Sequence, residues 1–458
     1  MPALRLALKK LDTAATPQTL RPVSRQAIPD QTVRGGIFLA ARYGLGVLVS
    51  LANMLVMTWW IGPHAYGLFV AAVGIVAFLA TLARLGVDTY LVRSEAPTAN
   101  DFGTATTLIL AASVVLLGAG ASVAPLLVRW FGNREFVWPY LALLLTIPVS
   151  GLTGVPMAQL ERALDFGRIA VIELISQFAG LLTAVLMAWR HTGVWAPVLG
   201  QIAWQVFTLL AVVSIAPNPT RLRFERSQAR TMLSYGLSLT TSLRTWQLRT
   251  LVNPLLVGRF AGPEGVAFVA LAIRIAESLG TFRLAAGRIA VAGLARLQDH
   301  HEQFRNALEQ ALFLQVITLG PLLCGFALCG PFLLRHFAGP RWLPSLAVYP
   351  FVAAGVLVNS IYNLQASALF VIGEARVVTE AYTAHVVLLA LTTLFLLPRA
   401  GIVGYGWAEL VACASYGAIH AGLARSVFIS YRRLVPWLAT FAAVLFVSSI
   451  SRTVGLLD

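Results

Sequence analysis

The sequence predicts an all-α polytopic membrane protein, built from two pseudo-symmetric six-helix bundles around a central cavity, plus one or two C-terminal helices. The first observation is composition: of 458 residues, 58% are hydrophobic and only 12% are charged, whereas soluble domains carry about 25% charged residues. The second is a series of apolar runs of about 20 residues, the length that crosses about 30 Å of hydrocarbon. The third is an internal repeat with a period of 200 residues.

The apolar runs divide the chain into segments. A polar, basic tail comes first and is expected in the cytoplasm. The runs of the first half predict six helices, near 36–61, 64–86, 104–128, 136–158, 169–189 and 194–216. Those of the second half predict six helices and a shorter last one, near 233–258, 265–287, 307–334, 343–371, 377–398, 402–424 and 434–451. The expected domains are the tail 1–34, a first lobe 35–216, a cytoplasmic linker 217–232, a second lobe 233–424 and an extra helix in 425–458.

The distribution of arginine predicts the orientation. A cytoplasmic amino terminus puts 14 arginines of the loops and helix ends on the cytoplasmic side and eight on the other. Because Lys and Arg in short loops set topology, this orientation is favoured. The net charge of +15 is spread between apolar runs, so the sequence argues against a nucleic-acid-binding face. A thirteenth helix would leave the carboxyl terminus outside, and the count stays open between 12, 13 and 14.

The repeat pairs short motifs between the two halves. A shift of 200 positions lays Gly62-Pro63 on Gly262-Pro263 and Asn53 on Asn253. Six helices return the chain to the side on which it started, so the halves should have the same topology. An axis along the membrane normal would then relate them, with a cavity at their interface.

Several kinds of chemistry are excluded. The only lysines are Lys9 and Lys10, so the chain lacks the lysine of a phosphate-binding loop, and no ATP is expected. Cys324, Cys329 and Cys413 show no C-x-x-C spacing, so neither a disulfide framework nor a zinc site is predicted. No metal and no cofactor are expected. The predicted outer loops are all short, which argues against an enzyme such as an O-antigen polymerase.

Cations inside the apolar runs are the main functional signal, because a charge within hydrocarbon costs several kcal/mol. They gather on helices 1, 2, 7 and 8, which the repeat makes equivalent pairs. Guanidinium groups match phosphate geometry, so these helices predict a cavity for an anionic, phosphorylated substrate. The alternative for each of these arginines is that it snorkels to the interface or pairs with another residue for a structural reason. The predicted substrate-binding residues are Arg42, Asn53, Arg84, Arg244, Arg249, Arg274 and Arg283.

Acidic and aromatic residues complete the candidates. Four intramembrane acids could carry a coupling ion or balance an arginine; they are Glu173, Glu277, Glu380 and Glu409. His385 is interpreted as a helix-packing histidine. Four tryptophans could stack on sugar rings, although an interfacial belt is the more common role; they are Trp59, Trp60, Trp204 and Trp246.

Four short stretches resemble one family of transporters. They are Ile61-Gly-Pro-His-Ala-Tyr-Gly-Leu-Phe69, Leu85-Gly-Val-Asp-Thr-Tyr-Leu-Val-Arg93, Leu160-Glu-Arg-Ala-Leu-Asp-Phe166 and Ala295-Arg-Leu-Gln-Asp299. In their order and spacing they resemble the polysaccharide-transporter branch of the multidrug, oligosaccharidyl-lipid and polysaccharide exporter (MOP) superfamily. The resemblance implies a flippase of the bacterial inner membrane for undecaprenyl-diphosphate-linked oligosaccharide in O-antigen or exopolysaccharide synthesis. It also implies alternating access, and partners among membrane lipids and polysaccharide polymerase or assembly proteins.

Two rival functions remain open within the same superfamily. A multidrug or organic-cation antiporter should favour acids in its cavity, whereas helices 7 and 8 carry four arginines to one glutamate. A lipid II flippase for peptidoglycan precursors would need the same arginines, so their presence does not exclude it.

Overall fold

The computed structural model describes residues 57–94, 97–216, 222–281 and 301–453, with 237–244, 301 and 449–453 described by their backbone alone. Every element in these ranges is a helix, so the predicted all-α fold is confirmed for them. Within these ranges nine helices are long and apolar enough to cross a membrane. The predicted helix near 36–61 lies outside the described residues, except for a helical end at 57–60.

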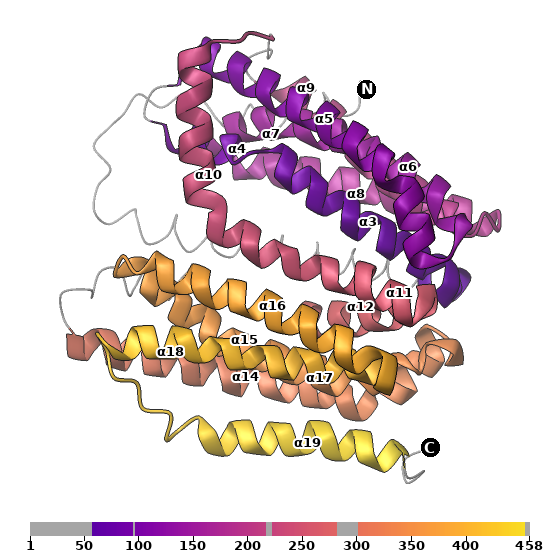
Figure 1. Ribbon diagram of the computed structural model, residues 1–458, viewed down its shortest axis with the longest axis vertical. Coiled ribbons are helices and arrows are strands. Elements are labelled where there is room, and N and C mark those ends of the chain that lie inside the picture. The colour runs from indigo at the N-terminus through magenta and orange to yellow at the C-terminus, as the bar shows by residue number, and fades with distance from the viewer. Residues whose placement is uncertain (1–56, 95–96, 217–221, 282–300, 454–458) are drawn as a thin grey trace. The chain divides into compact units, whose positions relative to one another are not determined.

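We call the helices before residue 217 the first bundle (Figure 1). They are α3 Pro63–Ala83, α4 Val87–Arg93, α5 Ala99–Phe131, η1 Arg134–Phe136, α6 Val137–Leu144, α7 Thr146–Arg162, α8 Phe166–Trp189 and α9 Trp195–Ile215. Local sequence explains their ends. The Thr98 and Asp101 side chains form a capping box at the start of α5, and Gly132 ends that helix at φ 66°, as expected for a glycine in the left-handed region.

The second bundle contains the remaining helices. They are α10 Arg226–Leu248, η2 Arg249–Leu251, η3 Asn253–Val257, α11 Gly258–Phe260, α12 Gly262–Leu279, α14 His301–Phe337, η4 Pro340–Trp342, α15 Ser345–Val371, α16 Ala375–Ala400, α17 Ile402–Ala412, η5 Cys413–Ser415, α18 Tyr416–Ala424 and α19 Val435–Thr453. The last helix packs on α14 and α15 (Figure 1). Gly320 of α14 makes room for it, because a Cβ there would lie 2.2 Å from the Phe441 ring.

The run predicted as one helix over 233–258 is broken. After α10 the backbone forms a 3₁₀ turn, η2, and then a π-helix, η3, at Asn253–Val257. Pro254 lacks an N–H, so one hydrogen bond of the α-helical ladder is lost at this position. Asn253 is buried, and its Nδ2 donates to the Val266 carbonyl of α12 at 3.4 Å. The break therefore sits against α12.

The repeat-related helices α3 and α12 pack directly on each other. Each begins at its Gly-Pro pair, Gly62-Pro63 for α3 and Gly262-Pro263 for α12. The approach is closest at Gly67, where a Cβ would lie 1.8 Å from the Pro263 carbonyl oxygen. Small residues allow such close packing between membrane helices. The two bundles thus meet along the pair that the internal repeat relates.

The bundles also touch beyond this helix pair. Arg341 and Trp342 of η4 donate to the Thr58 carbonyl at 3.0 and 2.8 Å, and Arg341 also donates to the Trp59 carbonyl. At the other end of α3, Gly86 faces Gly236 of α10 so closely that a Cβ on Gly86 would lie 2.6 Å from the Gly236 carbonyl oxygen. Among the described residues, the bundles are therefore in contact near both ends of α3.

Candidate functional site

Two neighbouring cavities lie beside α8 and α9. The smaller, of about 440 Å³, is lined by residues of α3, α8, α9 and α12 and by Met57. The larger, of about 600 Å³, is lined by α4, α7, α8, α9 and Arg84 at the end of α3. Gln177 and Trp204 line both cavities. We call the two together the chamber.

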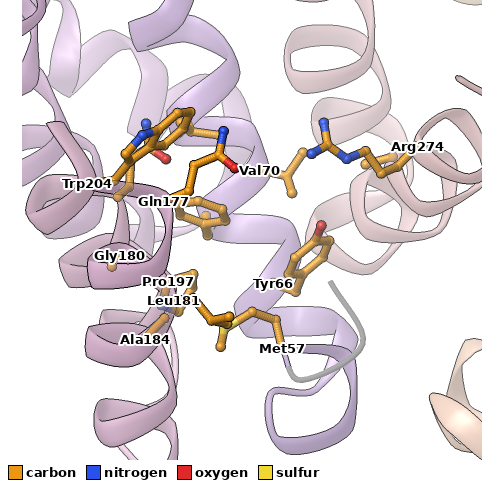
Figure 2. A pocket seen from close by; sticks show the side chains of 15 residues that line it. Met57, Tyr66, Val70, Gln177, Gly180, Leu181, Ala184, Pro197, Trp204 and Arg274 are labelled. Atoms are coloured by element: carbon orange, nitrogen blue, oxygen red, sulfur yellow. The ribbon is translucent and has the colours of Figure 1, made fainter. Parts of the chain in front are cut away.

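Both bundles contribute to the smaller cavity. Figure 2 shows Gln177 and Trp204 on one side of it and Tyr66 and Arg274 on the other. Arg274 comes from α12 of the second bundle, whereas the other three belong to the first. A guanidinium, a phenol, an indole and an amide therefore converge on one space. This set can bind an anionic group and the hydroxyls of a polar ligand.

The larger cavity carries charges of both signs. Arg84 and Arg93 lie with Asp88 on its wall, together with Glu161 and Glu173. Arg84 and Asp88 form an i, i+4 ion pair at 3.7 Å, with side chains 42% and 26% exposed. A partly exposed pair of this length is weak. The Arg84 guanidinium can therefore exchange its partner for a ligand at little cost.

The turn between α3 and α4 positions these charged groups. Leu85 and Gly86 both have positive φ, 54° and 73°, a conformation that most residues avoid. The turn separates Arg84, at the end of α3, from Asp88 and Arg93 on α4. Arg162 of α7 donates to the carbonyls of Leu91, at 2.9 Å, and Ser94. These bonds satisfy the carbonyls at the end of α4 and hold that helix against α7.

The structure places the predicted cations in different settings. Arg42, Asn53 and Arg283 lie outside the described residues, and of Arg244 only the backbone in α10 is described. Arg84 and Arg274 line the chamber. Arg249 instead forms an ion pair with Glu409 of α17 in the second bundle.

The Arg249–Glu409 pair is buried, with side chains 18% and 4% exposed. The guanidinium carbon lies 5.2 Å from the centre of the Trp246 ring. Gly355 of α15 faces the carboxylate, and a Cβ there would lie 2.9 Å from the Glu409 Cγ. Neither Arg249 Nε nor Glu409 Oε2 has a hydrogen-bond partner. The arrangement holds an arginine in place with part of its bonding capacity unused.

The other predicted acids differ in environment. Glu173 lines the larger cavity. Glu277 is exposed on α12, as is Arg274. Glu380, 60% exposed, accepts from Arg376 Nε at 2.8 Å one turn into α16. His385 is fully buried, and its Nδ1 lies 3.1 Å from the Ala412 carbonyl oxygen, a contact typical of a packing histidine.

Sequence reasoning missed most of the chamber's polar lining. In the run 194–216, which contains no charge, it named Trp204 alone. Yet Gln201, Trp204, Gln205 and Thr208 recur there at i, i+3, i+4 and i+7, on one face of α9. All four line the chamber. Polar residues at helical spacing in an otherwise apolar helix would have identified this face.

A family model described as "Polysaccharide biosynthesis protein" matches residues 56–347, more than half of the chain. The chain belongs to this family. The resemblance predicted from the sequence is thereby confirmed. A comparison with curated protein sequences found no match.

The fold of this chain recurs in solved structures. It is similar to lipid II flippase MurJ in an inward closed conformation, with a TM-score of 0.75 and 14% identity over 90% of this chain and 92% of that one. It is also similar to a multidrug resistance MATE family transporter of the MOP superfamily in an inward-facing conformation (TM-score 0.64, 16% identity, 88% and 99%). A third similar structure is a MOP superfamily transporter from Pyrococcus furiosus, with a TM-score of 0.56 and 13% identity over 89% of this chain and 96% of that one. The two-bundle fold of these membrane transporters is therefore the fold of this chain.

Proposed function

We propose that this member of the polysaccharide biosynthesis family is a flippase for undecaprenyl-diphosphate-linked oligosaccharide. It would move repeat units from the cytoplasmic to the periplasmic leaflet of a bacterial inner membrane for O-antigen or exopolysaccharide synthesis. The observation that carries the proposal is the chamber, in which Arg274 of the second bundle faces Trp204 and Gln177 of the first. Its wall offers cations for a diphosphate together with neutral polar groups for sugars.

Chamber size and charge support this substrate class. A disaccharide-sized head group fits cavities of several hundred Å³, the usual range of ligand pockets. Arg84, Arg93 and Arg274 could bind the diphosphate as charge-assisted hydrogen-bond donors. Arg274 is the one charged residue that lines the smaller cavity among the described residues, which disfavours a drug cation there, whereas the larger cavity carries Arg84 and Arg93 together with Asp88, Glu161 and Glu173.

Alternating access is the proposed mechanism. The two bundles, predicted as lobes 35–216 and 233–424 joined by a linker at 217–232, would rock about the α3–α12 pair. The amino terminus would lie in the cytoplasm. A diphosphate that leaves a negative-inside cell gains ~2.3 kcal/mol of favourable electrical free energy per charge per 100 mV. That gain needs no ATP. The acids of the chamber, and Glu409 beside Arg249, are candidates for charge balance or for a coupling ion.

Gene deletion tests the function. Loss of surface polysaccharide, with lipid-linked oligosaccharide trapped on the cytoplasmic leaflet, is the expected result. Trapped lipid II with failing cell-wall synthesis would favour the peptidoglycan alternative. Unchanged lipid pools with altered dye resistance would favour drug export and refute the proposal. The same strain reports whether polymerase or assembly partners receive substrate.

Site variants test the role of the chamber. Arg274→Ala should abolish surface polysaccharide in the complemented strain while the protein still accumulates in the membrane, as should the predicted Arg42→Ala and Arg244→Ala. Arg399→Ala is the matched control, because Arg399 lies exposed at the end of α16 over the Phe395 ring. Normal polymer from all three predicted variants would refute the assignment of these cations.

A further inference from the structure

One face of α9 is polar where a membrane helix is ordinarily apolar. Gln201, Trp204, Gln205 and Thr208 lie along this face, and all four border the chamber. Thr208 Oγ1 donates to the Trp204 carbonyl at 2.8 Å, so its proton is already used within the helix. Trp204 itself is half-buried and lines both cavities. The amides and the indole are thus the groups that this face presents to a ligand.

Gln177 of α8 completes the wall beside Trp204. It lines both cavities too, and Figure 2 shows its amide next to the Trp204 indole. Its Oε1 is buried and has no hydrogen-bond partner. A buried amide oxygen without a partner is unfavourable, since it has lost water without gaining another donor. A ligand hydroxyl in the chamber would supply that donor.

Glycines hold the two side chains in place. A Cβ on Gly180 would lie 2.8 Å from the Trp204 Cβ and 2.9 Å from the Gly200 carbonyl oxygen. A Cβ on Gly200 would lie 2.7 Å from the Ala184 Cβ. Helices α8 and α9 therefore pack in close contact between these glycines. Gly180 follows Gln177 by three residues and Gly200 precedes Trp204 by four, so this packing sets the distance between the backbones that carry the amide and the indole.

The chemistry of this pair differs from that of the arginines. An amide both donates and accepts hydrogen bonds, as sugar hydroxyls do. An indole offers a flat apolar face with one polar N–H, which suits the C–H face of a sugar ring. A diphosphate only accepts hydrogen bonds and has no apolar face. The Gln177–Trp204 wall therefore matches a neutral saccharide, while Arg274 on the opposite side matches the anion.

We propose that Gln177 and Trp204, with Gln201, form a saccharide subsite separate from the diphosphate contacts. A sugar ring of the head group would stack on Trp204 while its hydroxyls bind the amides. This subsite would determine which glycan is accepted. The proposal rests on the proposed function, and it makes Trp204 and Gln177 specificity-determining residues.

A binding comparison with two ligands tests the subsite. One ligand is the lipid-linked saccharide extracted from the deletion strain, and the other is undecaprenyl diphosphate without sugar. Binding is measured by thermophoresis of the purified full chain in detergent. Trp204→Ala should weaken binding of the lipid-linked saccharide about tenfold, and Gln177→Leu roughly three- to tenfold, as expected for one lost stacking or hydrogen-bonding contact. Binding of the sugar-free diphosphate should not change.

Matched controls separate the subsite from general packing. Trp189→Ala removes a tryptophan of α8 that is 69% exposed outside the chamber, and it should change neither affinity. Arg274→Ala should weaken the binding of both ligands. If Trp204→Ala does not fold, Trp204→Phe keeps a ring face and should bind more tightly than a Trp204→Leu variant that has none.

The outcomes distinguish two failures. If Trp204→Ala and Gln177→Leu weaken both ligands equally, or neither, the saccharide subsite is refuted while the flippase proposal stands. If no lipid-linked saccharide accumulates in the deletion strain, or the wild-type protein binds neither ligand, the proposed function fails and the subsite with it.

Discussion

Breaking the buried ion pair between Arg249 and Glu409 is the most direct test of how the second bundle is held together. Glu409→Gln keeps the size of the side chain and removes its charge. The guanidinium of Arg249 then remains in a site where its own side chain is only 18% exposed. Removing one partner of a buried pair typically costs ~3–5 kcal/mol, because the remaining charge is desolvated and uncompensated. We expect a loss of this size for Glu409→Gln.

The structure narrows the expected magnitude. Arg249 retains the Trp246 ring face at 5.2 Å, a contact that contributes roughly 0.5–2 kcal/mol. The cost should therefore fall near the lower end of the range, ~3 kcal/mol. Replacing both partners, as Arg249→Met with Glu409→Leu, should restore most of this loss.

The assay is reversible unfolding of the purified protein in mixed micelles as the fraction of SDS rises. The matched control is Glu380→Gln, which breaks the exposed Arg376–Glu380 pair of α16 and should cost no more than ~0.5 kcal/mol. If Glu409→Gln costs no more than this control, the pair is not desolvated as described. If the double variant is as unstable as Glu409→Gln, the loss comes from packing and the electrostatic reasoning is wrong.

Three further predictions concern contacts elsewhere. Gly67→Ala should destabilise the protein by ~1–3 kcal/mol or more, since its Cβ would lie 1.8 Å from the Pro263 carbonyl oxygen. Gly118→Ala is the control and should not destabilise it, because Gly118 has open space around it. Equal unfolding curves for the two variants would contradict the α3–α12 contact. Arg341→Ala removes two hydrogen bonds to the first bundle and should broaden distances between spin labels on the two bundles near Gly62; an unchanged distribution would show that these bonds do not hold the bundles together. Burial raises the pKa of Tyr431, in the loop before α19, to about 12, so its contribution to stability is present below pH 10 and lost as the pH rises from 10 to 12. Tyr431→Phe should lack this part of the alkaline loss of unfolding free energy, and an identical pH profile would count against the burial.

The lengths of the apolar runs and the internal repeat predicted much of the architecture. The all-helical fold and the relation between the two halves follow from run length and the repeated Gly-Pro pair, because hydrocarbon thickness and helix rise leave few alternatives. Three predicted runs are broken in the structure: 136–158 divides between α6 and α7, 402–424 divides at η5 into α17 and α18, and 233–258 departs furthest. The run 233–258 reads as one helix in hydropathy, yet Pro254 and the contact of Asn253 with α12 break it into 3₁₀ and π turns. Hydropathy reports side-chain polarity alone, so it does not predict such a break in the backbone hydrogen bonds.

The amino-acid sequence by itself determined which residues must leave the hydrocarbon: charges such as Arg249 and Arg274 cannot face lipid at acceptable cost. Only the tertiary structure decided where each one went. Arg274 borders the chamber, whereas Arg249 pairs with a carboxylate 160 residues away. Helix rotation and partner choice arise from packing between distant segments, so no local pattern contains them. The neutral pair Gln177 and Trp204 could not be ranked from sequence for the same reason, since their role depends on the contact of Gly180 with Gly200.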